Sequence, residues 1–147
     1  LRFAYKYLDV QAEYGGVMQQ KAMLPKHRGF FNIGYTTRSS RWEYDFTTSV
    51  FGTSRLPINQ LADGSLTTNN ESEIFPMLSA QVTYVYKKWD FYLGGENLLN
   101  FTQDNPIIDS ENPFGTAFDA TRIWAPVFGV NVYFGIRLSI DQKDEEE

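Results

Sequence analysis

The feature that most constrains this chain is a strict alternation of residue types in its last patterned segment. In residues 127–140, "VFGVNVYFGIRLSI", every second residue is apolar, and mainly glycine, polar or charged residues stand between them. Successive side chains of a β-strand point to opposite sides, so this pattern predicts a strand with two unlike faces. The apolar row consists of Phe128, Val130, Val132, Phe134, Ile136 and Leu138.

The same alternation recurs along the 147 residues, and no segment has a convincing helical period. We therefore predict an all-β, antiparallel, up-and-down sheet of about six strands within one domain over residues 1–138. The predicted strands cover residues 1–13, 28–37, 41–52, 77–86, 89–96 and 127–140.

The links between these strands alternate between short and long. Two are brief, "RSSR" and "KK", whereas residues 14–27, 53–76 and 97–126 form long loops. In an up-and-down sheet this places all short turns at one end and all long loops at the other. Transmembrane β-barrels have this asymmetry, with short periplasmic turns and long extracellular loops. Soluble barrels and sandwiches need not have it.

Composition removes several other classes of function. The net charge is −5, which argues against nucleic acid as a partner. There is no cysteine, so the chain has no ligands for a thiolate metal site. It has one histidine, His27, which gives little support for a Ser-His-Asp triad. We expect no enzymatic activity, no metal and no cofactor. A run of about 18 apolar residues, which a transmembrane helix needs, is also missing.

The two faces of each predicted strand suggest lipid on one side and a lumen on the other. The apolar row would meet outer-membrane lipid, and polar residues would line a water-accessible interior. The predicted lumen-facing residues are Glu43, Asp45, Gln81, Asp90, Glu96, Asn131 and Arg137. Single-chain barrels of this type have at least about eight strands, so further strands are expected upstream or on other chains. The first residue is not methionine, and we expect the chain to be a piece of a longer polypeptide.

Three stretches of the sequence carry a resemblance to a known family. "YLGGENLLNFTQDNPII" is followed by "NPFGTAFDATRIWAPVFGVNVYFGIRL", and "GGVMQQKAMLPKHRGFFNIGY" precedes both. Together they resemble the C-terminal barrel region of TonB-dependent outer-membrane receptors of the Bacteroidetes type. The resemblance runs over essentially the whole chain, but the segment 139–147 after Leu138 departs from the family pattern. We expect this charged tail to be disordered.

The resemblance implies a 22-stranded barrel in the bacterial outer membrane, of which this chain would supply the last six strands. It also implies import of a scarce ligand, such as an iron–siderophore complex or another metal chelate, powered through the TonB complex. The N-terminal plug domain, the TonB contact and the remaining strands would lie outside this chain.

Candidate ligand-binding residues lie in the third long loop, because long loops at one end meet a ligand first. They are Gln103, Asp104, Asn105, Asp119, Arg122 and Trp124. The alternative for these residues is a structural role in loop turns and packing. Three alternatives also remain for the fold and function: a porin-like barrel, a barrel or adhesin built from several chains, and a soluble lipocalin-like protein that binds a small ligand.

Overall fold

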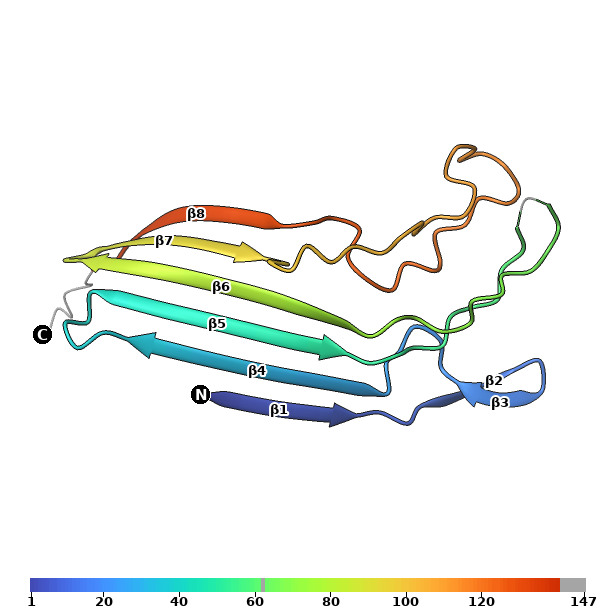
Figure 1. The fold of residues 1–147 in the computed structure, drawn as a ribbon, viewed down its shortest axis with the longest axis horizontal. Coiled ribbons are helices and arrows are strands. Elements are labelled where there is room, and N and C mark those ends of the chain that lie inside the picture. The colour runs from blue at the N-terminus through green and yellow to red at the C-terminus, as the bar shows by residue number, and fades with distance from the viewer. Residues whose placement is uncertain (62, 141–147) are drawn as a thin grey trace, which may run out of the picture.

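A computed structural model describes residues 1–61 and 63–140 of the chain, and residues 141–147 of the predicted tail lie outside this part. Within the described residues the chain forms eight β-strands (Figure 1). They are β1 (Arg2–Tyr7), β2 (Gln11–Tyr14), β3 (Val17–Gln20), β4 (His27–Thr36), β5 (Trp42–Phe51), β6 (Phe75–Tyr86), β7 (Trp89–Glu96) and β8 (Asn131–Leu138).

Six of these strands form one antiparallel sheet in the order β1-β4-β5-β6-β7-β8, and β2 pairs with β3 in a separate hairpin. This confirms the predicted all-β, antiparallel architecture. The sheet is not closed into a barrel: β1 and β8 are its two edges. Short turns join the strands at one end, and long loops extend from the other (Figure 1).

The N-terminal prediction was wrong in its boundaries. The first strand ends at Tyr7 instead of residue 13. The β2–β3 hairpin begins within the predicted strand and ends at Gln20, inside the predicted loop 14–27. Gly15 and Gly16 both have positive φ, 57° and 83°, which lets a two-residue turn join Tyr14 to Val17. Adjacent glycines at positive φ are a strong hairpin signal.

The last strand also begins later than predicted, at Asn131 instead of residue 127. Phe128 and Val130 of the predicted lipid-facing row therefore precede the strand. Within the described part of the chain, residues 128–130 do not pair with a neighbouring strand. Hydrogen bonds from asparagine side chains fix their backbone instead. The Asn97 amide donates to the Phe128 carbonyl at 3.0 Å, and the Asn100 carbonyl oxygen accepts from the Val130 amide at 3.2 Å.

Strand register separates the side chains of the sheet into two unlike faces. One row across the sheet pairs Asp45 with Gln81, Gln81 with Gly94, and Gly94 with Tyr133. All seven residues predicted to face a lumen lie on the same face as this row. The opposite face carries Val132, Phe134, Ile136 and Leu138 of the predicted apolar row.

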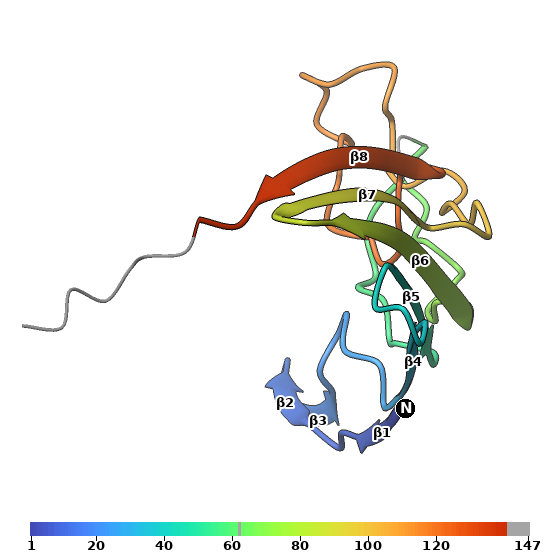
Figure 2. The same ribbon diagram turned by 90° about the vertical axis from the view of Figure 1, so that its left-hand side faces the viewer.

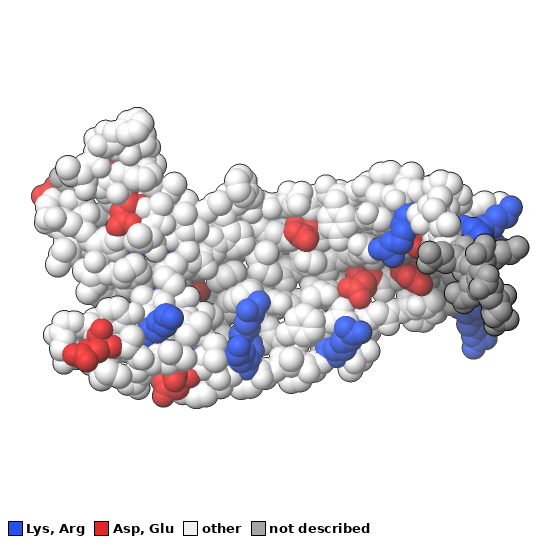
Figure 3. Space-filling model, turned by 180° about the vertical axis from the view of Figure 1, so that it is seen from behind, with Lys and Arg blue, Asp and Glu red and all other residues white. Residues whose placement is uncertain are grey.

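The sheet bends so that the polar face is concave. Figure 2 looks along the sheet and shows its strands arranged as an arc. Figure 3 views the concave side and shows acidic and basic side chains spread across it. The apolar side chains therefore occupy the convex side, where Phe134 is 67% exposed and Ile136 is 52% exposed. Among the described residues the buried apolar side chains are Leu56 and Phe75, both towards the long-loop end.

On the concave face, β7 and β8 pack two tyrosines over two glycines. The ring of Tyr92 lies over Gly135, where an added Cβ would come within 2.2 Å of it. Tyr133 lies over Gly94 in the same manner, at 2.4 Å. The two rings meet edge to face at 6.4 Å, and the Tyr133 hydroxyl donates to Gln81 at 3.1 Å. Aromatic cover of strand glycines helps to fix the register of neighbouring strands.

We expect Gly135→Ala to destabilise the protein by roughly 1–3 kcal/mol, because the new methyl group must displace the Tyr92 ring. Gly29→Ala in β4 is the matched control, since nothing lies within 4 Å of the added Cβ there. It should be neutral or stabilising by up to about 1 kcal/mol. Urea unfolding of both variants checks this, and an equal effect of the two substitutions would contradict the tyrosine–glycine packing.

Candidate functional site

A cluster of aromatic rings fixes the long loops to the end of the sheet. Phe75 at the start of β6 stacks on Phe51 at 4.8 Å and on Phe101 at 5.2 Å, and it contacts Trp124 at 5.5 Å. The guanidinium of Arg28 lies over the Phe51 ring at 4.4 Å. The loops after β5 and β7 therefore start from a packed base and do not project freely.

Asn97 ties the end of β7 to the segment before β8. It is 3% exposed and adopts a positive φ of 51°. Its side chain donates to the Phe101 carbonyl at 2.7 Å and accepts from the Phe101 amide at 3.0 Å. Sequence analysis missed this residue. The available signal was an asparagine directly after a strand, since asparagine tolerates left-handed backbone and bonds to nearby backbone groups.

A cavity of about 300 Å³ lies between the loops 52–74 and 97–130. Five of the six predicted ligand-binding residues line it: Gln103, Asp104, Asn105, Arg122 and Trp124. The other loop contributes Leu56, Asn69 and Glu73, which sequence analysis did not single out. The cavity therefore requires both loops, and residues more than 30 positions apart in the chain form its wall.

Two of the predicted residues hold the cavity wall together. The Gln103 carbonyl oxygen accepts from the Trp124 amide at 2.8 Å and from the Ala125 amide at 3.3 Å. The Gln103 amide donates to the Arg122 carbonyl at 2.9 Å. Trp124 packs on Phe75 and Phe101. Gln103 and Trp124 thus contact the loop backbone and the aromatic cluster.

Asp119 lies outside the cavity lining and joins the two loops. Its backbone pairs with Ile108, and its carboxylate accepts from the Thr121 amide at 2.7 Å and from the Asn59 amide. Burial acts to raise the pKa of Asp119, but the bonds from Thr121 and Asn59 and the charge of Arg122 outweigh it. The net result is a pKa below the usual value, which keeps this carboxylate ionised as a loop cross-link.

Arg122 lines the cavity, and one of its side-chain nitrogens has no hydrogen-bond partner among the described residues. One terminal nitrogen donates to the Asn69 carbonyl, whereas Nε is buried without a hydrogen-bond partner. Glu73 and Asp104, which also line the cavity, are exposed. No ion pair joins Arg122, Glu73 and Asp104 in the described part of the chain. The cavity thus combines one guanidinium with two carboxylates that are not paired with it.

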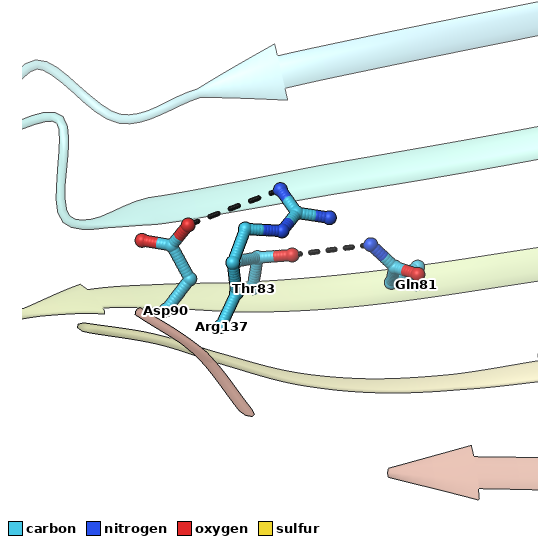
Figure 4. Close-up of polar contacts among 4 residues, drawn as sticks. All are labelled: Gln81, Thr83, Asp90 and Arg137. Atoms are coloured by element: carbon cyan, nitrogen blue, oxygen red, sulfur yellow. Dashed lines mark hydrogen bonds and ion pairs between the residues drawn. The ribbon is translucent and has the colours of Figure 1, made fainter. Parts of the chain in front are cut away.

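The concave face of the sheet carries a second polar array. Asp45 accepts from the Asn32 amide at 3.0 Å, and Gln81 donates to the Thr83 hydroxyl at 3.2 Å. The Arg137 guanidinium lies 3.9 Å from the Asp90 carboxylate. Figure 4 shows these two side chains pointing towards one another, beside Gln81 and Thr83. Arg137 is 71% exposed, so this ion pair contributes little to stability in water. These contacts orient the predicted lumen residues but bring no reactive pair together.

On β1 and β4 the concave face carries unpaired positive charge. Lys6 lies directly opposite Arg28 in the strand register, and both are exposed. Like charges at opposite positions on neighbouring strands repel each other. No ion pair to either residue is found among residues 1–61 and 63–140. The concave face is therefore basic at Lys6 and Arg28, whereas β5 and β7 contribute acidic side chains to it.

We expect Gln103→Ala to loosen residues 122–126, because three backbone groups lose their partner. Each unpaired group costs roughly 1–3 kcal/mol, so amide exchange at Trp124 and Ala125 should accelerate by at least about tenfold. Thr102→Ala, an exposed neighbour that makes none of these bonds, is the control. Hydrogen exchange followed by mass spectrometry gives the rates. Unchanged exchange at Trp124 would show that Gln103 does not hold this segment.

Other kinds of site were also sought. The described residues contain no group of three or more His, Asp or Glu side chains arranged to hold a metal ion. No helix in the described part of the chain has the length and apolar character needed to span a membrane. Comparison with known proteins found no matching family model, curated protein or solved structure. The geometry of the sheet and of the loop cavity therefore carries the functional interpretation.

Proposed function

We propose that this chain forms the C-terminal part of the barrel wall of a TonB-dependent transporter in a bacterial outer membrane. The observation that carries the proposal is the direction in which the sheet bends. Its convex side presents apolar side chains to the surroundings, and its concave side presents polar and charged ones. A membrane barrel requires this arrangement, because lipid lies outside and water or protein lies inside.

The same bend argues against the lipocalin-like alternative. A soluble barrel that binds a small apolar ligand turns its apolar rows inward, towards the concave side. Here Val132 and Phe134 are 64% and 67% exposed on the convex side. In water, such a continuous apolar surface would favour aggregation. Lipid as the surrounding solvent removes this difficulty.

Strand length and aromatic placement support a membrane-spanning wall. A transmembrane strand needs about 9–11 residues when tilted, and β4 and β5 each have 10. On the convex face near the short turns, Trp42 packs against Tyr84 at 4.7 Å, and Trp89 lies at the start of β7. Tryptophan and tyrosine at this level match the aromatic girdle at a membrane interface.

The two open edges of the sheet support the proposal that more strands close the barrel. Backbone amides and carbonyls of β1 and β8 cannot stay unpaired in hydrocarbon. By the family resemblance, upstream strands of the same polypeptide would pair with both edges, and a plug domain would contact the concave face. In a porin-like barrel or one built from several chains, other strands would close the wall.

Transport would then depend on parts outside this chain. The strands would supply a stable wall, and the long loops would help to capture the ligand on the cell exterior. The resemblance makes an iron–siderophore complex or another metal chelate one candidate cargo. Coupling to the TonB complex would pass through the plug.

A pair of arginine substitutions in β8 tests the face assignment in the intact membrane protein. Val132→Arg places a charge on the convex face in the row of Ala80 and Phe46, near the middle of β5. If that face meets lipid, we expect a loss of roughly 2–4 kcal/mol in folding stability in lipid bilayers. Asn131→Arg, one residue earlier on the concave face, should be much milder. Equal losses for both variants would rule out the assignment of lipid and lumen faces.

A further inference from the structure

The two short turns of the sheet are basic and lie side by side. The turn between β4 and β5 contains Arg38 and Arg41, and the turn between β6 and β7 contains Lys87 and Lys88. The Val85 amide donates to the Arg41 carbonyl at 2.7 Å, which joins the two turns at one end of the sheet. Neighbouring strands are about 4.8 Å apart, so the turns are about 10 Å from each other. At that separation, close to one Debye length, their charges act together.

Three of these basic side chains have no counter-ion of their own. Arg38, Arg41 and Lys87 are exposed, and no ion pair to any of the three is found among residues 1–61 and 63–140. We call these three residues the basic turn cluster. Figure 3 shows basic side chains at this end of the molecule, on the right of that view. Such a cluster attracts an anionic partner.

The opposite end of the sheet has the reverse charge. The long loops 52–74 and 97–130 carry mainly acidic side chains, namely Asp63, Glu71, Glu73, Asp104, Asp109, Glu111 and Asp119, against Arg55 and Arg122. The chain as a whole has a net charge of −5. The positive charge of the turns is therefore a local feature, and the short-turn end is the end of the sheet that an anionic surface attracts.

Aromatic side chains next to the turns indicate which kind of anionic surface fits. Trp42 follows Arg41, and Tyr86 and Trp89 flank the second turn on the convex face. The Lys87 ammonium group lies over the Tyr86 ring at 5.4 Å. Tryptophan and tyrosine favour the level of lipid headgroups, where one part of the ring meets hydrocarbon and the other meets water. Basic side chains just beyond them would reach the lipid phosphates.

The acidic residues nearest to the turns lie on the other face. Glu43 and Asp90 belong to the concave side in the strand register, and Asp90 pairs with Arg137 at 3.9 Å. A lipid headgroup that approaches from the convex side therefore meets aromatic and basic side chains and no carboxylate of these two residues.

We propose that Arg38, Arg41 and Lys87 bind the phosphate groups of anionic phospholipids in the inner leaflet of the membrane. Guanidinium groups donate two parallel hydrogen bonds to phosphate oxygens, and an ammonium group acts as a point charge. The aliphatic stems of both side chains can extend along apolar surface towards the headgroups. The inference rests on the proposed function, in which the short turns lie on the periplasmic side. It adds a class of lipid to a wall that otherwise requires only hydrocarbon.

The end of the chain is a competing partner of the right charge. The Ser139 amide donates to the Lys88 carbonyl at 2.9 Å, so the chain leaves the sheet beside the second turn. Residues 141–147 follow and lie outside the described residues. Their acidic members are Asp141, Asp144, Glu145, Glu146 and Glu147. Lipid is favoured as the occupant, because a contact with carboxylates makes no use of the exposed tryptophan and tyrosine rings.

The test uses the intact membrane protein in bilayers of phosphatidylcholine, with a fluorophore attached at Ser39→Cys in the first turn. A quencher-labelled phosphatidylglycerol is compared with phosphatidylcholine that carries the same quencher and the same acyl chains. Quenching measures how strongly each lipid is enriched beside the turn. Each basic side chain near an anionic surface strengthens binding by about fivefold, so Arg38→Gln with Lys87→Gln should lower the enrichment of phosphatidylglycerol at least about fivefold. Lys6→Gln with Lys21→Gln removes the same charge at the long-loop end and should leave it unchanged.

Enrichment of phosphatidylglycerol that is lost in the turn variant and kept in the control supports the proposal. Equal enrichment of the two lipids, or a turn variant that keeps the preference, overturns it. Displacement of the lipid by soluble glycerol phosphate would show a site for phosphate alone and overturn the lipid assignment. A preference that appears only after Asp144→Asn and Glu145→Gln would assign the turns to the end of the chain and likewise overturn it. Lys87→Gln alone, an exposed turn substitution, keeps the test informative if the double variant does not insert.

The failure of this inference and the failure of the proposed function have different signatures. Recovery of the intact protein in the soluble fraction of its source cells would refute the transporter and the lipid site together. A protein that inserts into bilayers, and in which Val132→Arg is far more harmful than Asn131→Arg, keeps the membrane wall. If that protein shows no preference for phosphatidylglycerol, only the basic turn cluster loses its assigned role.

Discussion

The structure depends on a single constraint: six paired strands must keep two incompatible faces apart. The backbone ladder fixes the register, and the register sends apolar side chains to one side and polar side chains to the other. The bend of the sheet then decides which face surrounds the other. Because the polar face is concave, the apolar face has no interior to enter, and the lipid that we propose around the protein would cover it. The open edges, the aromatic belt and the long loops at one end all fit that environment.

Much of this sheet could be predicted from sequence, because period-two alternation reports strand faces directly. In this way the apolar residues of β8 were assigned to one face of the sheet. Asp45, Gln81 and Asp90 were assigned to the other face. Alternation does not report where pairing stops. The N-terminal pattern continues beyond Tyr7, but Gly15 and Gly16 form a local hairpin that competes with a longer strand. Before β8, side-chain bonds from asparagines replace the ladder, and no periodic signal marks them.

The loop cavity was predictable only in part, for a different physical reason. Polar residues in a long loop indicate bonding capacity, but they do not tell whether the partner is a ligand or the loop itself. Gln103 and Asp119 direct their bonds to the loops, whereas Arg122 keeps a buried donor unused. Glu73 belongs to a different loop, and only the fold brings it to the same cavity. Sites that combine distant loops therefore require the structure.

A spin-label scan along β8 of the intact protein in lipid bilayers tests the central claim most directly. The 147 residues contain no cysteine, which makes labelling at single introduced cysteines straightforward within them. We expect labels at Val132, Phe134 and Ile136 to collide mainly with dissolved oxygen, which concentrates in hydrocarbon. Labels at Asn131 and Arg137 should be shielded from lipid and respond more to a water-soluble nickel complex. The absence of a two-residue period, or low accessibility of the apolar positions to both reagents, would contradict a lipid-facing convex surface.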